Sequence, residues 1–347
     1  MKIPSSEQLL YLANILMSRW VNAAKNAAAI LPQTILCVKY DEIGDVVNSS
    51  HVFALLKEKF PKATLHVLTK AYSAPLLEGN PHIDAVMTDI GAWKTRYDMV
   101  VEMRGTWRTL FKTLRYYPKL RFDRGWVRLQ HRGNQLHEVE TNAEIVKELV
   151  GDLAPQAPQL YLMEKHKLVA AHFISSHKLS RFAVIHAGAR KALRRWPAQN
   201  FAALADHLQQ QYGLQVVLAG IPEEVPQLQE IAQKAQHPVH LFTDGFSLLD
   251  LAALLEQAAL FVGNESGPLQ VADVMQTPLV ALFGPGVPTV FYPRNSKSKC
   301  IHHILECNPC DQVHCKYPEN TCMQRITQAE VNAAVAELLQ AENTAMT

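Results

Sequence analysis

The sequence has no apolar run of the roughly 20 residues that a helix needs to cross a bilayer. The richest early stretch, residues 9–17, is interrupted by an asparagine. A signal peptide is also missing, because Glu7 precedes this stretch and Arg19 and Lys25 follow it. We therefore expect a cytoplasmic protein. Apolar residues at helical spacing predict a first helix over 5–29, which either packs on the body of the protein or makes a peripheral contact with a membrane surface.

An excess of charge of one sign is missing too. The 34 Lys and Arg residues outnumber the 32 Asp and Glu residues by only two, so no global field would recruit nucleic acid or an anionic membrane. The chain has neither the GxGxxG fingerprint of dinucleotide oxidoreductases nor a Walker loop. We expect no nucleic-acid partner, and any basic function must be local.

Short apolar runs alternate with longer helix-like segments from residue 34 onward, which is typical of a parallel sheet. The pattern breaks at a proline-spaced stretch, 153–159, and then restarts. In the second half, Ser247 followed by Asp250 predicts a capping box at a helix start. The expected strands are 34–40, 64–69, 97–103, 182–186, 215–219, 240–242, 260–262 and 279–283.

A chain of 347 residues is longer than a single hydrophobic core usually grows. The pattern predicts an α/β protein with two Rossmann-like, doubly wound parallel-sheet domains, 1–165 and 166–325. A C-terminal helix within 326–347 could pack on either domain, including back on the first. Open parallel sheets bind ligands at the carboxyl ends of their strands. We therefore expect two domains that face each other across a cleft, with the site in that cleft.

The first candidate motif is 39–45, an expected strand that runs into a glycine turn and a helix start. Gly44 permits the turn, and Asp45 then lies at the carboxyl edge of the sheet, where it could take a proton from an acceptor hydroxyl. An Asp at a helix start is also a common N-cap. Both interpretations of Asp45 stay open.

The second motif, 186–197, combines a turn of small residues after His186 with four cations before a helix. Small residues such as Gly188 let a ligand approach the backbone, and fixed guanidinium groups can neutralise a leaving diphosphate. A solvated basic loop is the alternative. The cations are Arg190, Lys191, Arg194 and Arg195.

The third motif, 262–268, is an expected strand followed by a polar turn and a helix start, and the run 277–285 follows it. Backbone amides at the helix start and the Ser266 hydroxyl would make a phosphate cradle. A capped turn without a ligand is the alternative.

Together the three motifs resemble those of the bacterial lipopolysaccharide heptosyltransferases, over about residues 34–335. That family combines a strand ending in Gly-Asp, a Lys-Arg-Trp-Pro-like stretch and an Asn-Asp-Ser-Gly block. This chain has Gly44 and Asp45, the stretch 194–197, and the block 264–267. The resemblance implies a GT-B fold and an inverting, metal-independent glycosyltransferase. It would move a heptose from ADP-heptose onto a lipopolysaccharide core or related glycan at the inner face of the inner membrane.

The resemblance also implies roles for single residues. It makes Asp45 the general base and Arg194 the cation that faces the donor phosphates. Either Glu223 or Glu224 falls where the family contacts the nucleotide. Glu265, Ser266 and Gly267 match the phosphate and sugar loop. The other donor-binding candidates are His186, Gly188, Arg190, Arg195, Asn264 and Gln270.

Three positions depart from the family pattern, because Lys39 replaces a common Arg, Glu265 a common Asp, and Gln270 a common His. A Glu reaches one methylene further than an Asp, and a Gln cannot be a cation, so the donor sugar stays open. The alternatives are a related transferase with another nucleotide sugar or a protein acceptor, and a degenerate nucleotide-sugar-binding module without turnover.

A basic stretch interleaved with aromatic residues is the candidate acceptor region. Arginine forks bind phosphates and aromatic faces stack on sugars, as a lipid-linked or core oligosaccharide acceptor would require. RNA binding and a solvated helical face are the alternatives. We take Lys39, Arg104, Arg124 and Arg128 as acceptor-binding candidates. The rest of the stretch is Trp107, Arg108, Lys112, Arg115, Tyr116, Tyr117, Lys119, Arg121, Trp126 and Arg132.

Four of the six cysteines cluster near the C-terminus. Their close spacing would suit a small structural Zn or Fe site in a reducing compartment. Disulfides or free thiols are the alternatives. No cofactor is expected for catalysis. The four are Cys307, Cys310, Cys315 and Cys322.

Overall fold

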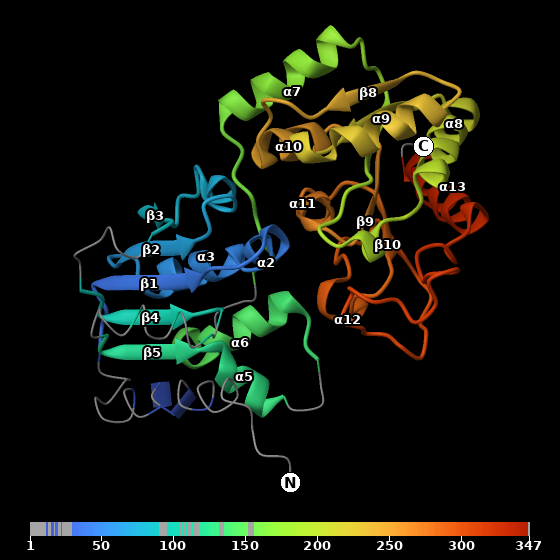
Figure 1. Cartoon of the computed structure of the whole chain (residues 1–347). Coiled ribbons are helices and arrows are strands. Elements are labelled where there is room, and N and C mark those ends of the chain that lie inside the picture. The colour runs from blue at the N-terminus through green and yellow to red at the C-terminus, as the bar shows by residue number, and fades with distance from the viewer. Residues whose placement is uncertain are drawn as a thin grey trace. The chain divides into compact units, whose positions relative to one another are not determined.

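The computed structural model describes residues 30–89, 96–104, 118–131, 135–151 and 156–345, and the single residues 12, 15, 16, 18, 19, 22, 106, 109 and 113. The chain divides into two compact units, Met1–Tyr161 and Leu162–Thr347. Figure 1 shows both, coloured from blue at the N-terminus to red at the C-terminus.

Unit 1 contains a five-stranded parallel sheet in the order β3-β2-β1-β4-β5, whose strands lie side by side in Figure 1. Its central strand β1 has five consecutive buried residues. Continuous burial of this kind is expected where helices cover both faces of a parallel sheet. The strands are β1 (Thr34–Lys39), β2 (Thr64–Thr69), β3 (Ala85–Met87), β4 (Met99–Glu102) and β5 (Leu120–Asp123).

The helices of unit 1 include α3 and α6, which pack on each other, and α5, which also packs on α6. α6 also contacts the edge strand β5. The helices are α2 (Ile43–Val47), α3 (Ser50–Lys59), η2 (Ala74–Leu77), α5 (Arg124–Gln130) and α6 (Glu138–Val150).

Unit 2 contains a six-stranded parallel sheet in the order β11-β10-β9-β6-β7-β8. All five residues of β6, β9 and β10 are buried. The strands are β6 (Phe182–His186), β7 (Gln215–Ala219), β8 (Val239–Phe242), β9 (Leu260–Asn264), β10 (Leu279–Phe283) and β11 (Ser298–His302).

The helices of unit 2 form two groups. Contacts join α8 to α9 and α13, and α10 to α7 and α11. The capping box predicted for α10 is confirmed, since the Ser247 hydroxyl accepts from the Asp250 amide and the Asp250 carboxylate accepts from the Ser247 amide. The helices are α7 (Glu164–Ser176), η3 (Ala192–Arg194), α8 (Ala198–Tyr212), η4 (Pro222–Glu224), α9 (Val225–Lys234), α10 (Leu248–Leu255), α11 (Gly267–Val274), α12 (Pro288–Phe291) and α13 (Gln328–Ala345).

The C-terminal helix α13 packs within unit 2, against α8, β10 and β11. Its buried residues Val331, Val335, Leu338 and Leu339 belong to the same apolar core as the inward residues of α8. Among the described residues, no helix is long and apolar enough to span a membrane.

Each sheet reverses its strand order at one place, between β1 and β4 in unit 1 and between β6 and β9 in unit 2. Open α/β sheets bind ligands outside the carboxyl ends of the strands at such a switch point. The loops that follow these four strands begin at Tyr40, Met103, Ala187 and Glu265. All three motifs singled out in the sequence therefore lie at switch points, and the predicted α/β fold class with two parallel-sheet units is confirmed.

Trp196 anchors the second motif in the core of unit 2. Its side chain is 1% exposed, its Nε1 donates to the Ile326 carbonyl at 2.9 Å, and its ring meets Phe201 edge-on. We expect Trp196→Ala to lower the free energy of unfolding of unit 2 by about 3–5 kcal/mol, because it leaves a large cavity. Denaturant unfolding followed by circular dichroism measures this. Trp196→Phe keeps a ring and should cost less; equal losses would show that the hydrogen bond, not packing, dominates.

Candidate functional site

Asp45 lies in the first turn of α2, directly after the switch-point strand β1. The N-cap of that helix is Glu42, and no side chain caps it, so capping does not account for Asp45. The side chain is half-buried. Burial raises the pKa of the Asp45 carboxyl, Lys39 opposes this rise and Glu138 adds to it. A raised pKa brings a carboxylate closer to the range in which it can accept a proton from substrate at neutral pH.

A cluster of buried charges acts on Asp45. Lys39 Nζ is 2.8 Å from Glu138 Oε1 and 3.4 Å from Asp41 Oδ2. Arg124 binds both oxygens of Glu138 through its two amino nitrogens, and Arg104 pairs with Asp41. Lys39 and Glu138 are fully buried. Buried charges are tolerated only when they are paired in this way.

The charges in this cluster hold one another ionised. Burial lowers the pKa of Lys39, and Glu138 counters that effect. Burial alone would raise the pKa of Glu138, but the cations Lys39 and Arg124 hold it well below its usual range. Glu138 escaped the sequence analysis because it lies 99 positions from Lys39 and belongs to no motif.

The four acceptor-binding candidates occupy different settings. Lys39 and Arg124 are engaged by Glu138, and Arg104 has a side chain that is 42% exposed beside Asp41. Arg128 is exposed in the last turn of α5. Acceptor contact by these four residues stays a prediction. Outside the described residues lie Trp107, Arg108, Lys112, Arg115, Tyr116, Tyr117, Arg132 and most of the predicted helix 5–29.

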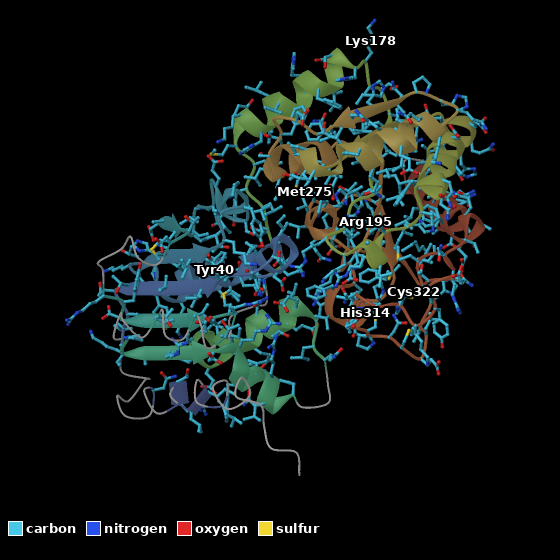
Figure 2. All side chains as sticks on the ribbon, in the orientation of Figure 1. Tyr40, Lys178, Arg195, Met275, His314 and Cys322 are labelled. Atoms are coloured by element: carbon cyan, nitrogen blue, oxygen red, sulfur yellow. The ribbon has the colours of Figure 1, made fainter. Side chains whose placement is uncertain are left out.

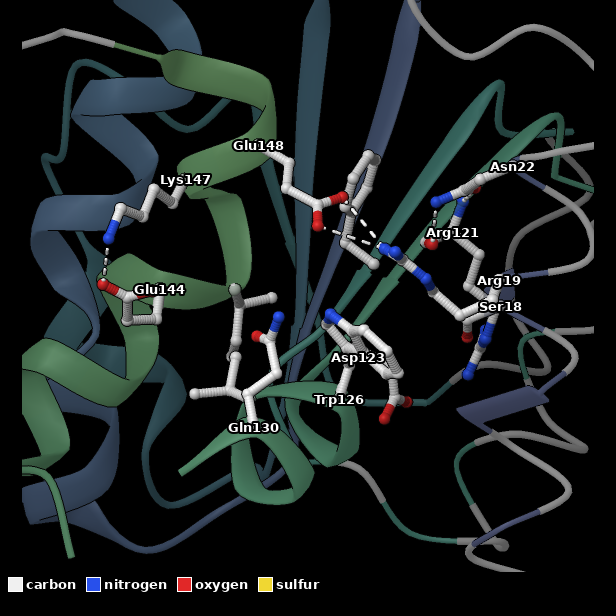
Figure 3. Close-up of a pocket in the computed structure, with 13 residues that line it drawn as sticks. Ser18, Arg19, Asn22, Arg121, Asp123, Trp126, Gln130, Glu144, Lys147 and Glu148 are labelled. Atoms are coloured by element: carbon white, nitrogen blue, oxygen red, sulfur yellow. Dashed lines mark hydrogen bonds and ion pairs between the residues drawn. The ribbon is translucent and has the colours of Figure 1, made fainter. Parts of the chain in front are cut away.

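A separate cavity of about 260 Å³ opens beside α5 and α6 in unit 1 (Figure 3). Arg19 lies 4.2 Å over the Trp126 ring and donates to both oxygens of Glu148. Asn22 exchanges two hydrogen bonds with the backbone of Arg121, each 2.8 Å long. None of the four acceptor-binding candidates lines this cavity. Arg121 and Trp126 of the same basic stretch do line it.

In unit 2, Asn264 ties together the two loops at the switch point. The side chain is fully buried. Its Oδ1 accepts from the Trp196 amide at 3.0 Å, and its Nδ2 donates to the Ala187 carbonyl at 2.7 Å. Because its side-chain oxygen and nitrogen both bond to the backbone, Asn264 holds the two loops together.

A carboxylate, an imidazole and a hydroxyl form a row across the ends of β7, β6 and β9. His186 Nε2 is 3.4 Å from Glu224 Oε2, and His186 Nδ1 is 3.2 Å from Ser266 Oγ. Glu224 is half-buried and Glu223 exposed. A Cβ on Gly188 would lie 1.8 Å from Glu224 Oε1, so a side chain at this position would displace the Glu224 carboxylate.

The start of α11 fits an anion. Ser266 is the N-cap, but its hydroxyl makes no capping bond to the helix, and Gly267 opens the first turn. Unsatisfied backbone amides at a helix start attract phosphate through their N–H groups and the helix dipole. This turn therefore has the chemistry to hold an anionic group such as a diphosphate.

Arg194 reaches Glu265 beside this turn. Its Nη1 is 3.2 Å from Glu265 Oε1, and its Nε donates to Gln312 Oε1 at 2.7 Å. Glu265 is 5% exposed, and its Oε2 has no hydrogen-bond partner among the described residues. Burial raises the pKa of Glu265 to about 7 although Arg194 lowers it. A Cβ on Gly286 would lie 1.8 Å from this Oε2.

The remaining donor-binding candidates are divided between the surface and the interior. Arg190 and Arg195 are both exposed, and Arg195, labelled in Figure 2, donates from Nε to the Ala189 carbonyl of its own loop. Gln270 is 3% exposed and donates to the Phe291 carbonyl at 2.8 Å. The side-chain amide of Gln270 thus holds the last residue of α12. The family pattern has a His at the position of Gln270.

The four clustered cysteines line one small cavity of unit 2 together with Leu193. Figure 2 labels Cys322 in this region. All four are free thiols in this structure. Burial raises the pKa of Cys322, and the nearby Cys315 and Cys310 add to the rise. In the described part of the chain no three side chains of His, Cys, Asp or Glu converge closely enough to hold a metal ion. The Zn or Fe site stays a prediction.

The chain matches known glycosyltransferases in sequence and in fold. Residues 94–320 match the model of glycosyltransferase family 9 (heptosyltransferase). Lipopolysaccharide heptosyltransferase 3 of Escherichia coli is 25% identical over 274 residues, which cover 70% of this chain and 80% of that protein. The glycosyltransferase family 9 structure from Veillonella parvula DSM 2008 is 21% identical, with a TM-score of 0.76 over 89% of this chain and 97% of that one. ADP-heptose lps heptosyltransferase II of E. coli is 22% identical, with a TM-score of 0.70 over 89% and 99%. The fold is thus the two-domain GT-B fold of these enzymes.

Glu265→Gln tests the buried carboxyl. Its pKa is about 7 in the folded chain against 4.5 ordinarily, so between these pH values the folded state binds a proton that the unfolded state has lost. The free energy of unfolding of the wild type should therefore fall as pH rises from 4.5 to 7, by up to roughly 3 kcal/mol relative to the variant. Urea unfolding at pH 5 to 8 measures this. The exposed Glu256→Gln is the control and should follow the wild type; a Glu265→Gln curve parallel to the wild type would show that the carboxyl stays ionised throughout.

Proposed function

Because the chain belongs to glycosyltransferase family 9, the heptosyltransferase family, we propose that it transfers a heptose from ADP-heptose to a lipopolysaccharide core or related glycan. The transfer is inverting and uses no catalytic metal. Support for the donor and the acceptor comes from the names of its relatives, an ADP-heptose lps heptosyltransferase II and a lipopolysaccharide heptosyltransferase 3. Peripheral contact of the predicted helix 5–29 with the membrane that carries the acceptor belongs to the same proposal.

The observation that carries the proposal is the free carboxylate of Asp45 at the switch point of unit 1. The neighbouring carboxylates are occupied, Asp41 by Lys39 and Arg104, and Glu42 by Lys70. Among the described residues, no side chain donates a hydrogen bond to Asp45. Its carboxylate is thus available to an incoming hydroxyl, and its raised pKa suits a general base.

The proposed reaction is a single displacement at the anomeric carbon of the heptose. The acceptor oxygen forms a bond to this carbon while its proton passes to Asp45. The bond from the carbon to the phosphate oxygen breaks, and adenosine diphosphate leaves with the electron pair. Negative charge grows on the leaving oxygen, where the amides at the start of α11, the Ser266 hydroxyl and the Arg194 guanidinium would stabilise it.

A related transferase with another nucleotide sugar is the second candidate. Gln270 and Glu265 favour it, because both depart from the family pattern and both are nearly fully buried. Gln270 is held by the Phe291 carbonyl and could not supply the positive charge of a His. The comparison of ADP-heptose with other nucleotide sugars as donors decides between the two.

Asp45→Asn removes the base and keeps the size of the side chain. We expect transfer to slow by about 10²–10⁴-fold, the usual contribution of general-base assistance, while the thermal midpoint and nucleotide-sugar affinity change little. Release of adenosine diphosphate with a core glycan acceptor measures the rate, and calorimetry the affinity.

Glu58→Gln on the exposed side of α3 is the matched control and should transfer at the wild-type rate. Transfer by Asp45→Asn at the wild-type rate would exclude Asp45 as the base, and Asp41, Glu42 and His51 would then be tested.

Arg194→Ala should lower kcat more than it weakens donor binding, because the charge on the leaving diphosphate grows toward the transition state. We expect a loss of about 10²-fold in kcat, typical of removing one donor to a developing anion. Steady-state kinetics with varied donor concentration separates kcat from KM. A rise in KM with unchanged kcat would instead assign Arg194 to ground-state binding.

A further inference from the structure

The segment 307–322, here called the cysteine segment, reaches the donor-site arginine through one side chain. Gln312 Oε1 accepts a 2.7 Å hydrogen bond from Arg194 Nε, across 118 positions of sequence. Leu193, the neighbour of Arg194, lines the small cavity that the four cysteines share. The cysteine segment and the loop that carries Arg194 are therefore in direct contact.

Arg194 needs support from outside its own loop. It ends η3, a three-residue turn of helix with no buried residue, and its side chain is 25% exposed. A long arginine side chain has about 2 kcal/mol of rotamer entropy to lose on being fixed. Without external contacts, the guanidinium would sample many orientations, few of them suited to a phosphate.

Two contacts restrain the guanidinium. Nε donates a hydrogen bond to Gln312 Oε1, and Nη1 forms an ion pair with Glu265 Oε1 at 3.2 Å. Since the five N–H groups of a guanidinium point in fixed directions, holding two nitrogens orients the third. Nη2 has no partner among the described residues. The group is thus oriented in advance with one amino nitrogen available for a phosphate oxygen.

The chemistry of Gln312 suits this task. A neutral amide oxygen accepts from Nε without adding a negative charge that would compete with a diphosphate for the arginine. Glu265 already supplies one carboxylate at this guanidinium. A second carboxylate would reduce the net positive charge that the donor meets.

The cysteine segment holds Gln312 in an unusual conformation. Gln312 has a φ of 61°, in the left-handed region that costs a residue other than glycine about 1 kcal/mol or more. The backbone amide of Gln312 donates to Cys310 Sγ at 3.4 Å. Asp311 closes the same turn by accepting from the amides of Val313 and His314. These contacts direct the Gln312 side chain toward Arg194.

We propose that Gln312 is a positioning residue of the donor site, which orients Arg194 toward the leaving diphosphate, and that the cysteine segment is the scaffold holding Gln312 in place. The inference rests on the proposed role of Arg194 in transfer. It also assigns a function to the cysteine cluster that depends on neither a metal nor a disulfide.

A double-mutant cycle in the full-length chain tests the proposal. Gln312→Leu keeps the volume of the side chain and removes the acceptor. We expect kcat to fall about tenfold, the equivalent of one hydrogen bond to a charged group, with the donor KM changed less than threefold. In the Arg194→Ala background the same substitution should leave kcat unchanged, because the side chain that it orients is gone.

Two further variants separate positioning from folding. Gln312→Gly adopts the left-handed conformation without strain, so its kcat should also fall about tenfold, and this measurement stands even if Gln312→Leu unfolds. Val313→Ala, at a neighbouring side chain that is 58% exposed, should retain wild-type kinetics.

Each contrary result has a separate meaning. Wild-type kcat in both Gln312 variants would overturn the positioning role and leave the role of Arg194 intact. A tenfold loss that persists in the Arg194→Ala background would show that Gln312 acts through another group, which also overturns the inference. Wild-type kcat in Arg194→Ala would refute the role of Arg194 in the proposed function, and the positioning role with it.

Discussion

Burial of both faces of each parallel sheet is the constraint on which the rest of the structure depends. In β1 and β10 the central residues have no exposed surface, so these strands can carry few charges along their length. In β1 the polar side chains Thr34 and Lys39 accordingly stand at the two ends of the strand. At the switch points the loops diverge and leave space outside the sheet. Asp45, His186 and Ser266 all follow or end such strands, which is why the chemistry gathers there.

The two switch points manage charge in different ways. In unit 1 a buried set of paired ions includes Lys39 and Glu138, and the cations Lys39 and Arg124 lower the pKa of the Glu138 carboxyl. Buried pairs of this kind gain little net stability, but they are costly to break. In unit 2 two neutral side-chain amides hold the site residues. Asn264 joins the two loops, and Gln312 accepts a hydrogen bond from Arg194. The positive charge of Arg194 consequently remains opposed by one carboxylate, that of Glu265.

Two glycines explain how long carboxylates fit into the interior of unit 2. A Cβ at Gly188 would overlap Glu224, and a Cβ at Gly286 would overlap Glu265. Glu265 replaces the common Asp of the resembled family and reaches one methylene further. The Glu265 carboxylate lies in the space that Gly286 leaves open. A sequence change in one loop thus depends on the absence of a side chain in another.

The sequence by itself determined the α/β class, most of the central strands and the placement of the three motifs at strand ends, because alternation of apolar runs and turn residues is a local property of the chain. It missed β3, β5 and β11, which all lie at a sheet edge. β3 has only three residues, and β5 carries Arg121 and Asp123 within four. Local patterns could not reveal that Glu138 would meet Lys39, or Gln312 would meet Arg194, across 99 and 118 positions. Only the tertiary structure decided these partners, since a contact between distant residues depends on how whole helices and loops pack against the sheet.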